Sequence, residues 1–175
     1  IHPFRVTHSI PDTCGFAIDT PEGRIFHVPE HKMDQNPVDG MKFDIERAKE
    51  LAKDGALFLA SDCLGANKPG IAKGELQIEE NFERIARSAK KAIFATAISS
   101  NIGRFQQMIN VAEKIGRKVV FIGRSVQRKT DIAYSLGILK YRKGSVIGYR
   151  DSLDLSRNRI MYIVAGCYGQ DGSSI

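Results

Sequence analysis

The chain has 175 residues, 42% of them hydrophobic, and its 26 Lys and Arg against 20 Asp and Glu give a net charge of +6. This length can bury one substantial core or two small ones, and no apolar run approaches the roughly 18 residues that a membrane helix needs, so we expect a globular protein without a membrane partner. The basic excess suits a polyanionic partner such as a nucleic acid, although a well-solvated surface has the same net charge.

The ends and the cysteines indicate a cytoplasmic protein. The first residues, Ile1 to Arg5, lack the charged-then-apolar layout of a signal peptide, and the three cysteines have no paired spacing typical of disulfides or zinc knuckles. Both ends look cut in mid-element, so we expect an internal fragment of a longer chain.

The first part of the chain predicts a small β-rich unit. Three short apolar runs open it, and the turn Thr20-Pro21-Glu22-Gly23 between the last two is typical of a β-hairpin; the runs are Phe4 to Thr7, Gly15 to Asp19 and Arg24 to Val28. A helix over Phe43 to Lys53 follows, capped by Asp44 and ended by Asp54-Gly55. A buried strand over Ala56 to Ala60 completes this part.

After Asn67-Lys68-Pro69-Gly70 the pattern changes to regular alternation of helices and strands. We expect helices at Glu79 to Lys90, Ile102 to Ile115 and Arg128 to Leu136, and strands at Ala92 to Thr96, Lys118 to Ile122 and Ile160 to Val164. Such alternation is typical of a parallel, doubly wound sheet. The sequence therefore predicts an α/β fold with a domain boundary near Lys68.

Three strand ends carry side chains that could bind a metal ion. His8 follows the first strand, Glu30 follows the hairpin with His31 beside it, and Asp62 ends the third apolar strand. Imidazole and carboxylate together suit zinc or manganese, and a carboxylate that bridges two ions would lower the pKa of a shared water. The alternatives are a structural histidine, a solvated Glu-His pair and a turn-capping aspartate.

Two strand-to-helix junctions are predicted to face a phosphate. The first carries Ser99, Ser100, Asn101 and Arg104, and the second carries Gly123, Arg124 and Ser125. Helix N-termini bind anions, and junctions in successive βα units lie on the same edge of a sheet. Simple helix capping by Ser100 or Asn101 is the alternative reading.

A third glycine-rich strand end, 164–174, could add backbone donors and a stacking ring from Tyr168. Cys167 in this segment has no His-plus-acid arrangement tied to it in sequence, so a small buried residue is the preferred interpretation.

Six strings in order resemble the middle of ribonuclease J proteins, which belong to the metallo-β-lactamase/β-CASP group. They are VTHSIPD, HVPEHKMDQNPVDG, LASDCLGANKPG, ATAISSNIGRFQQ, GRSVQRK and AGCYGQDGSS. The resemblance implies a C-terminal part of a metallo-β-lactamase αββα domain at 1–67 and most of a β-CASP domain at 68–175. It also implies hydrolysis of RNA phosphodiester bonds, both 5′-to-3′ and internally, with two metal ions, zinc or else Mn²⁺ or Mg²⁺, and it leaves homo-oligomer formation open.

The resemblance assigns roles residue by residue. His8 matches a metal-binding histidine of the family, Glu30 falls where the family has a metal-bridging aspartate, and Asp62 matches the acidic residue that ends the next strand. The two junctions correspond to segments that line the RNA channel. The chain departs from the family pattern at Pro29-Glu30, at Gly103 and at 166–170.

The family's His-x-His-x-Asp-His motif is missing from this sequence, as are later His-bearing motifs, so we expect the fragment itself to be inactive or nearly so. Two further hypotheses stay open. One is a non-catalytic RNA-binding module, and the other is a β-CASP hydrolase of DNA or of another phosphoester.

Overall fold

A computed structural model describes residues 1–34, 36–70 and 74–166 of the chain. The chain divides into two compact units, Ile1–Leu76 and Gln77–Ile175. The predicted third glycine-rich segment, including Cys167 and Tyr168, lies outside the described residues from position 167 onward.

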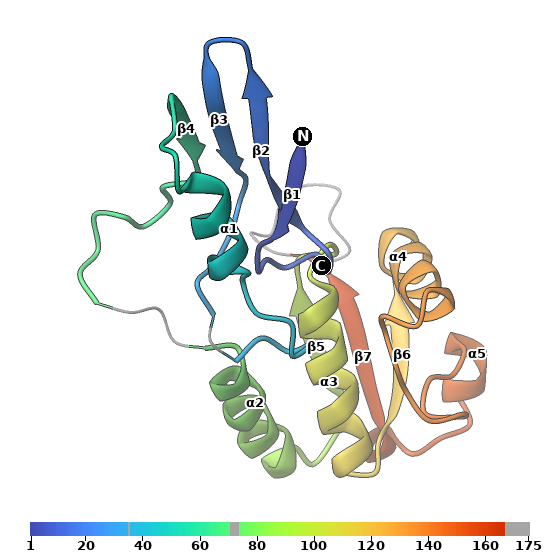
Figure 1. Ribbon diagram of the computed structural model, residues 1–175. Helices are drawn as coiled ribbons and strands as arrows, with labels where there is room; N and C mark the ends of the chain where they lie inside the picture. The colour runs from blue at the N-terminus through green and yellow to red at the C-terminus, as the bar shows by residue number, and fades with distance from the viewer. Residues whose placement is uncertain (35, 71–73, 167–175) are drawn as a thin grey trace. The chain divides into compact units, whose positions relative to one another are not determined.

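The first unit is built on a four-stranded sheet with the order β1-β2-β3-β4 (Figure 1). Strands β1 (His2–Arg5), β2 (Cys14–Thr20) and β3 (Gly23–Val28) are antiparallel, and β4 (Phe58–Ser61) pairs parallel to β3. The predicted hairpin is confirmed, since Thr20 pairs with Gly23 across the turn. Gly23 has a φ of 147°, a backbone conformation that favours glycine.

Helix α1 (Ile45–Ala52) lies within the predicted range Phe43 to Lys53, and Asp44 is its N-cap as the sequence predicts. The Asp44 carboxylate accepts a hydrogen bond from the Arg47 amide at 3.0 Å, which satisfies one of the free donors of the first turn. The helix contributes Leu51 to a small core of five buried residues, whose other members are Phe4, Val6, Ala17 and Phe26.

The predicted burial of the fourth strand is wrong. Phe58 and Leu59 of β4 are 58% and 61% exposed. The reason is position, because β4 forms the outer edge of the sheet and the apolar cluster of this unit gathers around β1, β2 and β3 instead.

The second unit is the parallel α/β layer that the alternating pattern predicts. Its strands have the order β5-β7-β6, with bounds β5 (Ile93–Ala97), β6 (Lys118–Ile122) and β7 (Ile160–Ala165), and both pairings are parallel. Its helices are α2 (Leu76–Ser88), α3 (Ile102–Lys114), α4 (Arg124–Ser135) and the short α5 (Tyr149–Ser152), followed by a 3₁₀ turn at Arg157–Arg159. The predicted α/β class is confirmed.

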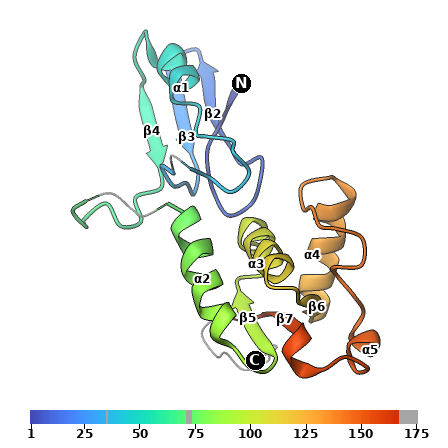
Figure 2. The ribbon, with the colours of Figure 1, turned by 90° about the horizontal axis from the view of Figure 1, so that it is seen from below.

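Helices cover both faces of this sheet (Figure 2). Side chains of α2, α3 and α4 form one core with alternate residues of the strands, among them Ala95, Phe121 and Ile163. The other face carries Tyr162, whose ring lies 6.5 Å from Tyr149 and whose hydroxyl lies 3.4 Å from Ser152 Oγ, so the short α5 covers part of that side. Parallel strands need such crossover helices, and helices on both faces define a doubly wound sheet.

Candidate functional site

The carboxyl ends of β5 and β6 bring the two predicted junctions together. Ser99 Oγ lies 3.3 Å from Ser125 Oγ, although the two residues are 26 positions apart. The Lys129 ammonium donates a hydrogen bond to Ser99 Oγ at 2.8 Å. Two hydroxyls and one ammonium group therefore gather at one place on the sheet edge, which we call the serine–lysine cluster (Ser99, Ser125 and Lys129).

Lys129 was not among the predicted site residues. It lies one helical turn after Ser125, and residues four apart share a helix face. This i, i+4 spacing is a signal that could have identified the residue. The approach of Ser99 to the same point depends on the order of the strands in the sheet. The spacing of residues along the chain does not reveal that order.

Helix α4 begins beside this cluster with its N-terminal donors uncapped by a side chain. Gly123 is its N-cap residue, with a φ of 103° and no side-chain cap hydrogen bond. An L side chain at this φ would be strained, so glycine suits the junction. Free N–H groups and the helix dipole favour an anion here, and the exposed Arg124 beside them adds a guanidinium that can bind phosphate.

Helix α3 begins differently, because its N-cap is satisfied within the protein. Asn101 Oδ1 accepts a hydrogen bond from the Arg104 amide at 2.9 Å. The amide of Ile102 donates to the Ser100 carbonyl at 3.0 Å. Asn101 is thus a capping residue in this structure, the alternative role that the sequence left open. Any contact of Ser100, Asn101 or Arg104 with RNA stays a prediction.

In the first unit the predicted metal ligands form two separate contacts. His8 Nε2 lies 3.2 Å from Glu30 Oε2, and the Glu30 side chain is 80% exposed. Asp62 Oδ1 accepts a hydrogen bond from the Leu64 amide at 2.9 Å. That bond is the main cause that lowers the pKa of Asp62 below its ordinary value, and the nearby His31 lowers the same pKa further.

Across residues 1–34, 36–70 and 74–166, no three His, Cys, Asp or Glu side chains are grouped closely enough to hold a metal ion. The described residues therefore do not by themselves fit the two-metal site of the family pattern. The ligand roles of His8, Glu30 and Asp62 stay a prediction, and no chemical step is assigned to them.

Comparison with known proteins identifies relatives for nearly the whole chain. The family model "Ribonuclease J, beta-CASP domain" matches residues 90–175. The chain is 36% identical over 167 residues to ribonuclease J of Thermus thermophilus and 33% identical over 167 residues to that of Corynebacterium glutamicum. Each alignment covers 95% of this chain, which spans 29% and 23% of the two relatives' lengths.

A solved structure shares the fold. A protein of unknown function from Enterococcus faecalis V583 superposes with a TM-score of 0.59 at 14% identity, covering 95% of this chain and 41% of that one. Among the residues that the structure describes, no helix is long and apolar enough to cross a membrane.

Proposed function

Because the chain belongs to the ribonuclease J family, we propose that it forms part of a ribonuclease and that its serine–lysine cluster binds a phosphate of the RNA backbone. The observation that supports this best is the convergence of two βα junctions on one point, where Lys129 Nζ and Ser125 Oγ both lie within hydrogen-bonding distance of Ser99 Oγ. Phosphate oxygens accept hydrogen bonds from hydroxyls, ammonium groups and helix N-termini.

The cluster would act by binding and orientation. The Lys129 ammonium neutralises part of the phosphate charge, and the two hydroxyls turn their hydrogens toward its oxygens. The uncapped first turn of α4 adds backbone donors, and Arg124 adds a guanidinium at the exposed rim. In this proposal the groups contact the phosphate and no base, so the binding does not depend on the nucleotide sequence of the RNA.

We further propose that the full-length protein is metal-dependent, with zinc, or else Mn²⁺ or Mg²⁺, as its ion. His8, Glu30 and Asp62 would supply part of the ligand set, and other segments of the protein would supply the rest. His8 and Glu30 already lie 3.2 Å apart, which supports a shared role for that pair. When bound, such ions supply a water of lowered pKa.

RNA affinity of variants tests the phosphate site. Lys129→Gln removes the cluster's charge, and we expect it to weaken binding of a fluorescein-labelled single-stranded RNA about fivefold, since an exposed charged contact contributes on the order of 1 kcal/mol. The slope of log affinity against log salt should fall by about 0.7, the value for one phosphate on a single strand. Fluorescence anisotropy at several salt concentrations measures both.

Lys140→Gln is the matched control, because Lys140 is an exposed lysine of the same unit. Equal losses in the two variants, or none in Lys129→Gln, would contradict the proposed site. A DNA strand of the same sequence, run in parallel, tests the alternative of a DNA-acting hydrolase.

A non-catalytic RNA-binding module is the second candidate, and the contact of two serine hydroxyls and one lysine in the serine–lysine cluster suits it equally well, since binding alone requires no metal ligand. The two candidates differ in their response to chelation. If the full-length protein, loaded with metal, cleaves a 5′-monophosphorylated RNA and loses this activity in chelator, it is the enzyme. If it leaves RNA intact but binds it with or without chelator, the binding module is correct.

A further inference from the structure

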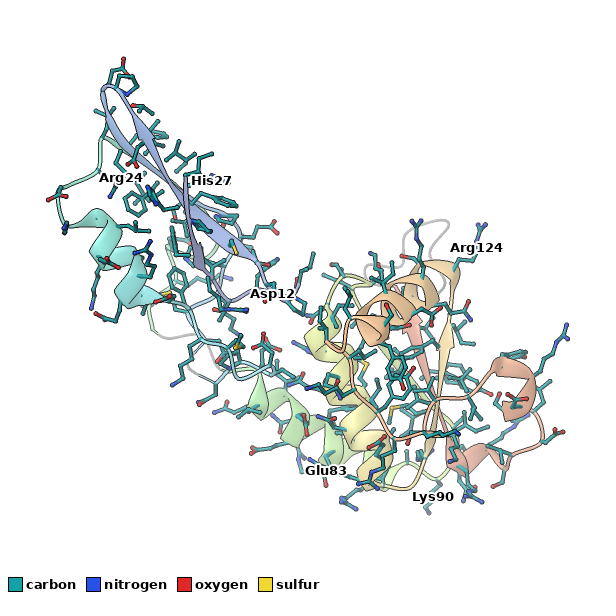
Figure 3. The ribbon with its side chains drawn as sticks, turned by 45° about the vertical axis from the view of Figure 1, so that its right-hand side comes forward. Asp12, Arg24, His27, Glu83, Lys90 and Arg124 are labelled. Atoms are coloured by element: carbon teal, nitrogen blue, oxygen red, sulfur yellow. The ribbon has the colours of Figure 1, made fainter. Side chains whose placement is uncertain are left out.

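A second basic site lies at the amino ends of the parallel strands, away from the serine–lysine cluster. A pocket of about 540 Å³ opens there, and cationic side chains dominate its lining. We call it the basic pocket; it is lined by Ala86, Arg87, Ala89, Lys90, Lys114, Ile115, Arg117 and Asn158. Figure 3 shows Lys90 and Arg124 at opposite ends of the second unit's strands.

Arg117 is the buried member of the pocket. It is 7% exposed, and its guanidinium donates hydrogen bonds to three carbonyl oxygens, those of Lys91 at 2.6 Å, Ala89 at 2.5 Å and Ile160 at 3.2 Å. The carbonyl oxygens accept hydrogen bonds from the guanidinium but carry no formal negative charge that would balance it. No described carboxylate lies within ion-pair distance of this guanidinium. A buried charge without a counter-charge is costly, so an anion in the pocket would stabilise it.

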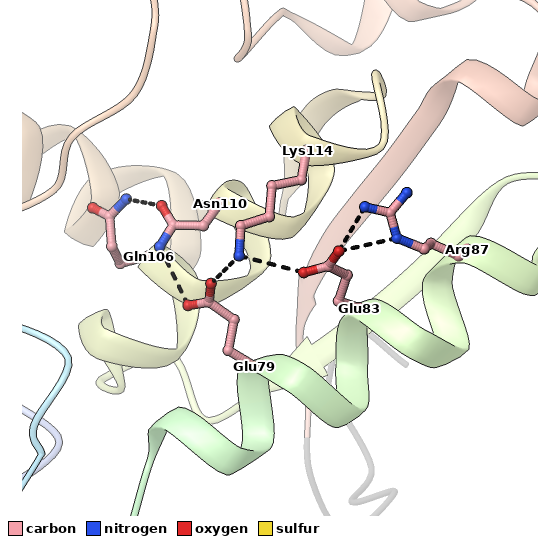
Figure 4. Close-up of polar contacts among 6 residues, drawn as sticks. All are labelled: Glu79, Glu83, Arg87, Gln106, Asn110 and Lys114. Carbon is pink, nitrogen blue, oxygen red and sulfur yellow. Dashed lines mark hydrogen bonds and ion pairs between the residues drawn. The ribbon is translucent and has the colours of Figure 1, made fainter.

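Two neighbouring cations, Arg87 and Lys114, are neutralised by glutamates of α2 (Figure 4). Arg87 donates two hydrogen bonds to Glu83 Oε1, at 2.6 and 2.9 Å. Lys114 lies 2.9 Å from Glu79 and 3.3 Å from Glu83. Two carboxylates thus face two cations, and neither carboxylate lines the pocket.

Lys90 is the exposed cation at the rim. It is not ion-paired within the described part of the chain. Together with Arg117 it leaves the pocket with two positive charges that the surrounding carboxylates do not balance. The charge of the pocket therefore matches a doubly charged anion.

We propose that the basic pocket is an anion site that binds a phosphate group, either free or carried on a nucleotide chain. Free phosphate can carry two negative charges and so matches the two uncompensated charges, and two successive phosphodiesters of a nucleotide chain, with one charge each, match them together, whereas a single carboxylate matches one. The oxygens of the phosphate can accept hydrogen bonds from Arg87 at the end of α2, from Lys90 after it and from Lys114 at the end of α3, all of which line the pocket. The five-residue strand β5 separates this site from the serine–lysine cluster by about 16 Å.

Titration with inorganic phosphate tests the site in the 175-residue chain. We expect saturable shifts of the Arg87, Lys90 and Arg117 amide signals in ¹H–¹⁵N NMR spectra, with chloride at equal ionic strength as the reference. Lys90→Glu should weaken phosphate binding about fivefold or more, and Lys114→Gln should weaken it less, because Lys114 already has two carboxylate partners. Lys53→Glu, an exposed lysine of the other unit, makes the same charge change and should leave phosphate affinity unaltered.

Far-UV circular dichroism confirms that each variant is folded, and the exposed position of Lys90 makes its substitution compatible with the fold. The proposal is overturned if chloride reproduces the shifts, or if Lys90→Glu and Lys53→Glu bind phosphate equally well.

A parallel titration with single-stranded RNA identifies the source of the phosphate. If Lys90→Glu lowers both phosphate and RNA affinity, the group belongs to a nucleotide chain; if it lowers phosphate affinity alone, the ligand is free phosphate. Loss of RNA binding in Lys129→Gln without any change in phosphate shifts at Lys90 separates this site from the proposed function.

Discussion

The two compact units bury very different amounts of apolar surface. The first unit holds five buried hydrophobic residues in its cluster, and the second holds fifteen around its parallel sheet. The first unit also leaves Phe58 and Leu59 exposed on its edge strand. Because apolar burial is the main stabilising term in folding, the second unit is expected to be the more stable of the two, and the first is expected to open more readily.

Truncation of one core phenylalanine in each unit tests this difference most strongly. Phe105 is fully buried, with its ring 6.2 Å from that of Phe121, and Phe105→Ala should cost about 4 kcal/mol. Phe4 is 3% exposed in the smaller core. Phe4→Ala should lower the free energy of unfolding by about 3 kcal/mol, because a small core relaxes more easily around the lost ring. Urea unfolding followed by residue-resolved NMR measures each unit separately, and a larger loss for Phe4→Ala would contradict the comparison.

Removal of one N-cap in each unit should have a smaller effect. Asn101→Ala and Asp44→Ala each delete the side chain that accepts from the third helical amide, and each should destabilise its own unit by about 1 kcal/mol. Hydrogen exchange of α3 and α1 amides measures this.

Asn101→Asp sharpens the cap test. It keeps the cap and adds a negative charge near the serine–lysine cluster, so it should preserve stability while weakening RNA binding. Unchanged RNA affinity in this variant would show that Asn101 lies away from the phosphate.

The smallest expected effect is the pH response of one exposed ion pair in each unit. The hydrogen bond from Arg24, followed by that from His2, lowers the pKa of Asp19 to about 2 from the ordinary 3.8. In the second unit, the hydrogen bond from Arg87, followed by that from Lys114, lowers the pKa of Glu83. Both pKa values are depressed by folding, so the stabilisation is present above the unfolded pKa and is lost as the pH falls through the folded one.

For Asp19 this loss runs from about pH 4 to about pH 2. Carboxyl ¹³C NMR titration measures both groups. Arg24→Met should raise the pKa of Asp19 and leave that of Glu83 unchanged, and Arg87→Met should do the reverse. A shift of both groups in either variant would mean that the units are electrostatically coupled.

Local signals predicted most elements to within a few residues. The strand over Lys118 to Ile122 has the predicted bounds, and α3 starts at Ile102 as expected because Asn101 caps it. Helix α4 starts at Arg124 rather than Arg128, since Gly123 can serve as N-cap and frees the next residues for the helix. The short α5 was missed because four residues carry no periodic pattern.

Features that depend on distant parts of the chain were not predictable in the same way. The exposure of Phe58 follows from its place at a sheet edge, and the approach of Lys129 to Ser99 follows from the strand order. The buried, carboxylate-free environment of Arg117 likewise combines the segment between α2 and β5 with the first residue of β7. Sequence reasoning placed Ser99 and Ser125 on one sheet edge from the βα rule alone, and the contact between them agrees with that placement.

The position of β7 has a consequence for the order of folding. This strand comes last among the three in sequence but lies between β5 and β6, which do not pair with each other. Until residues 160–165 leave the ribosome, both earlier strands lack the partner on their inner side. The sheet is therefore expected to form late in synthesis, in a slow step dominated by long-range contacts. During that interval the incomplete chain exposes the unpaired edges of β5 and β6 to chaperones.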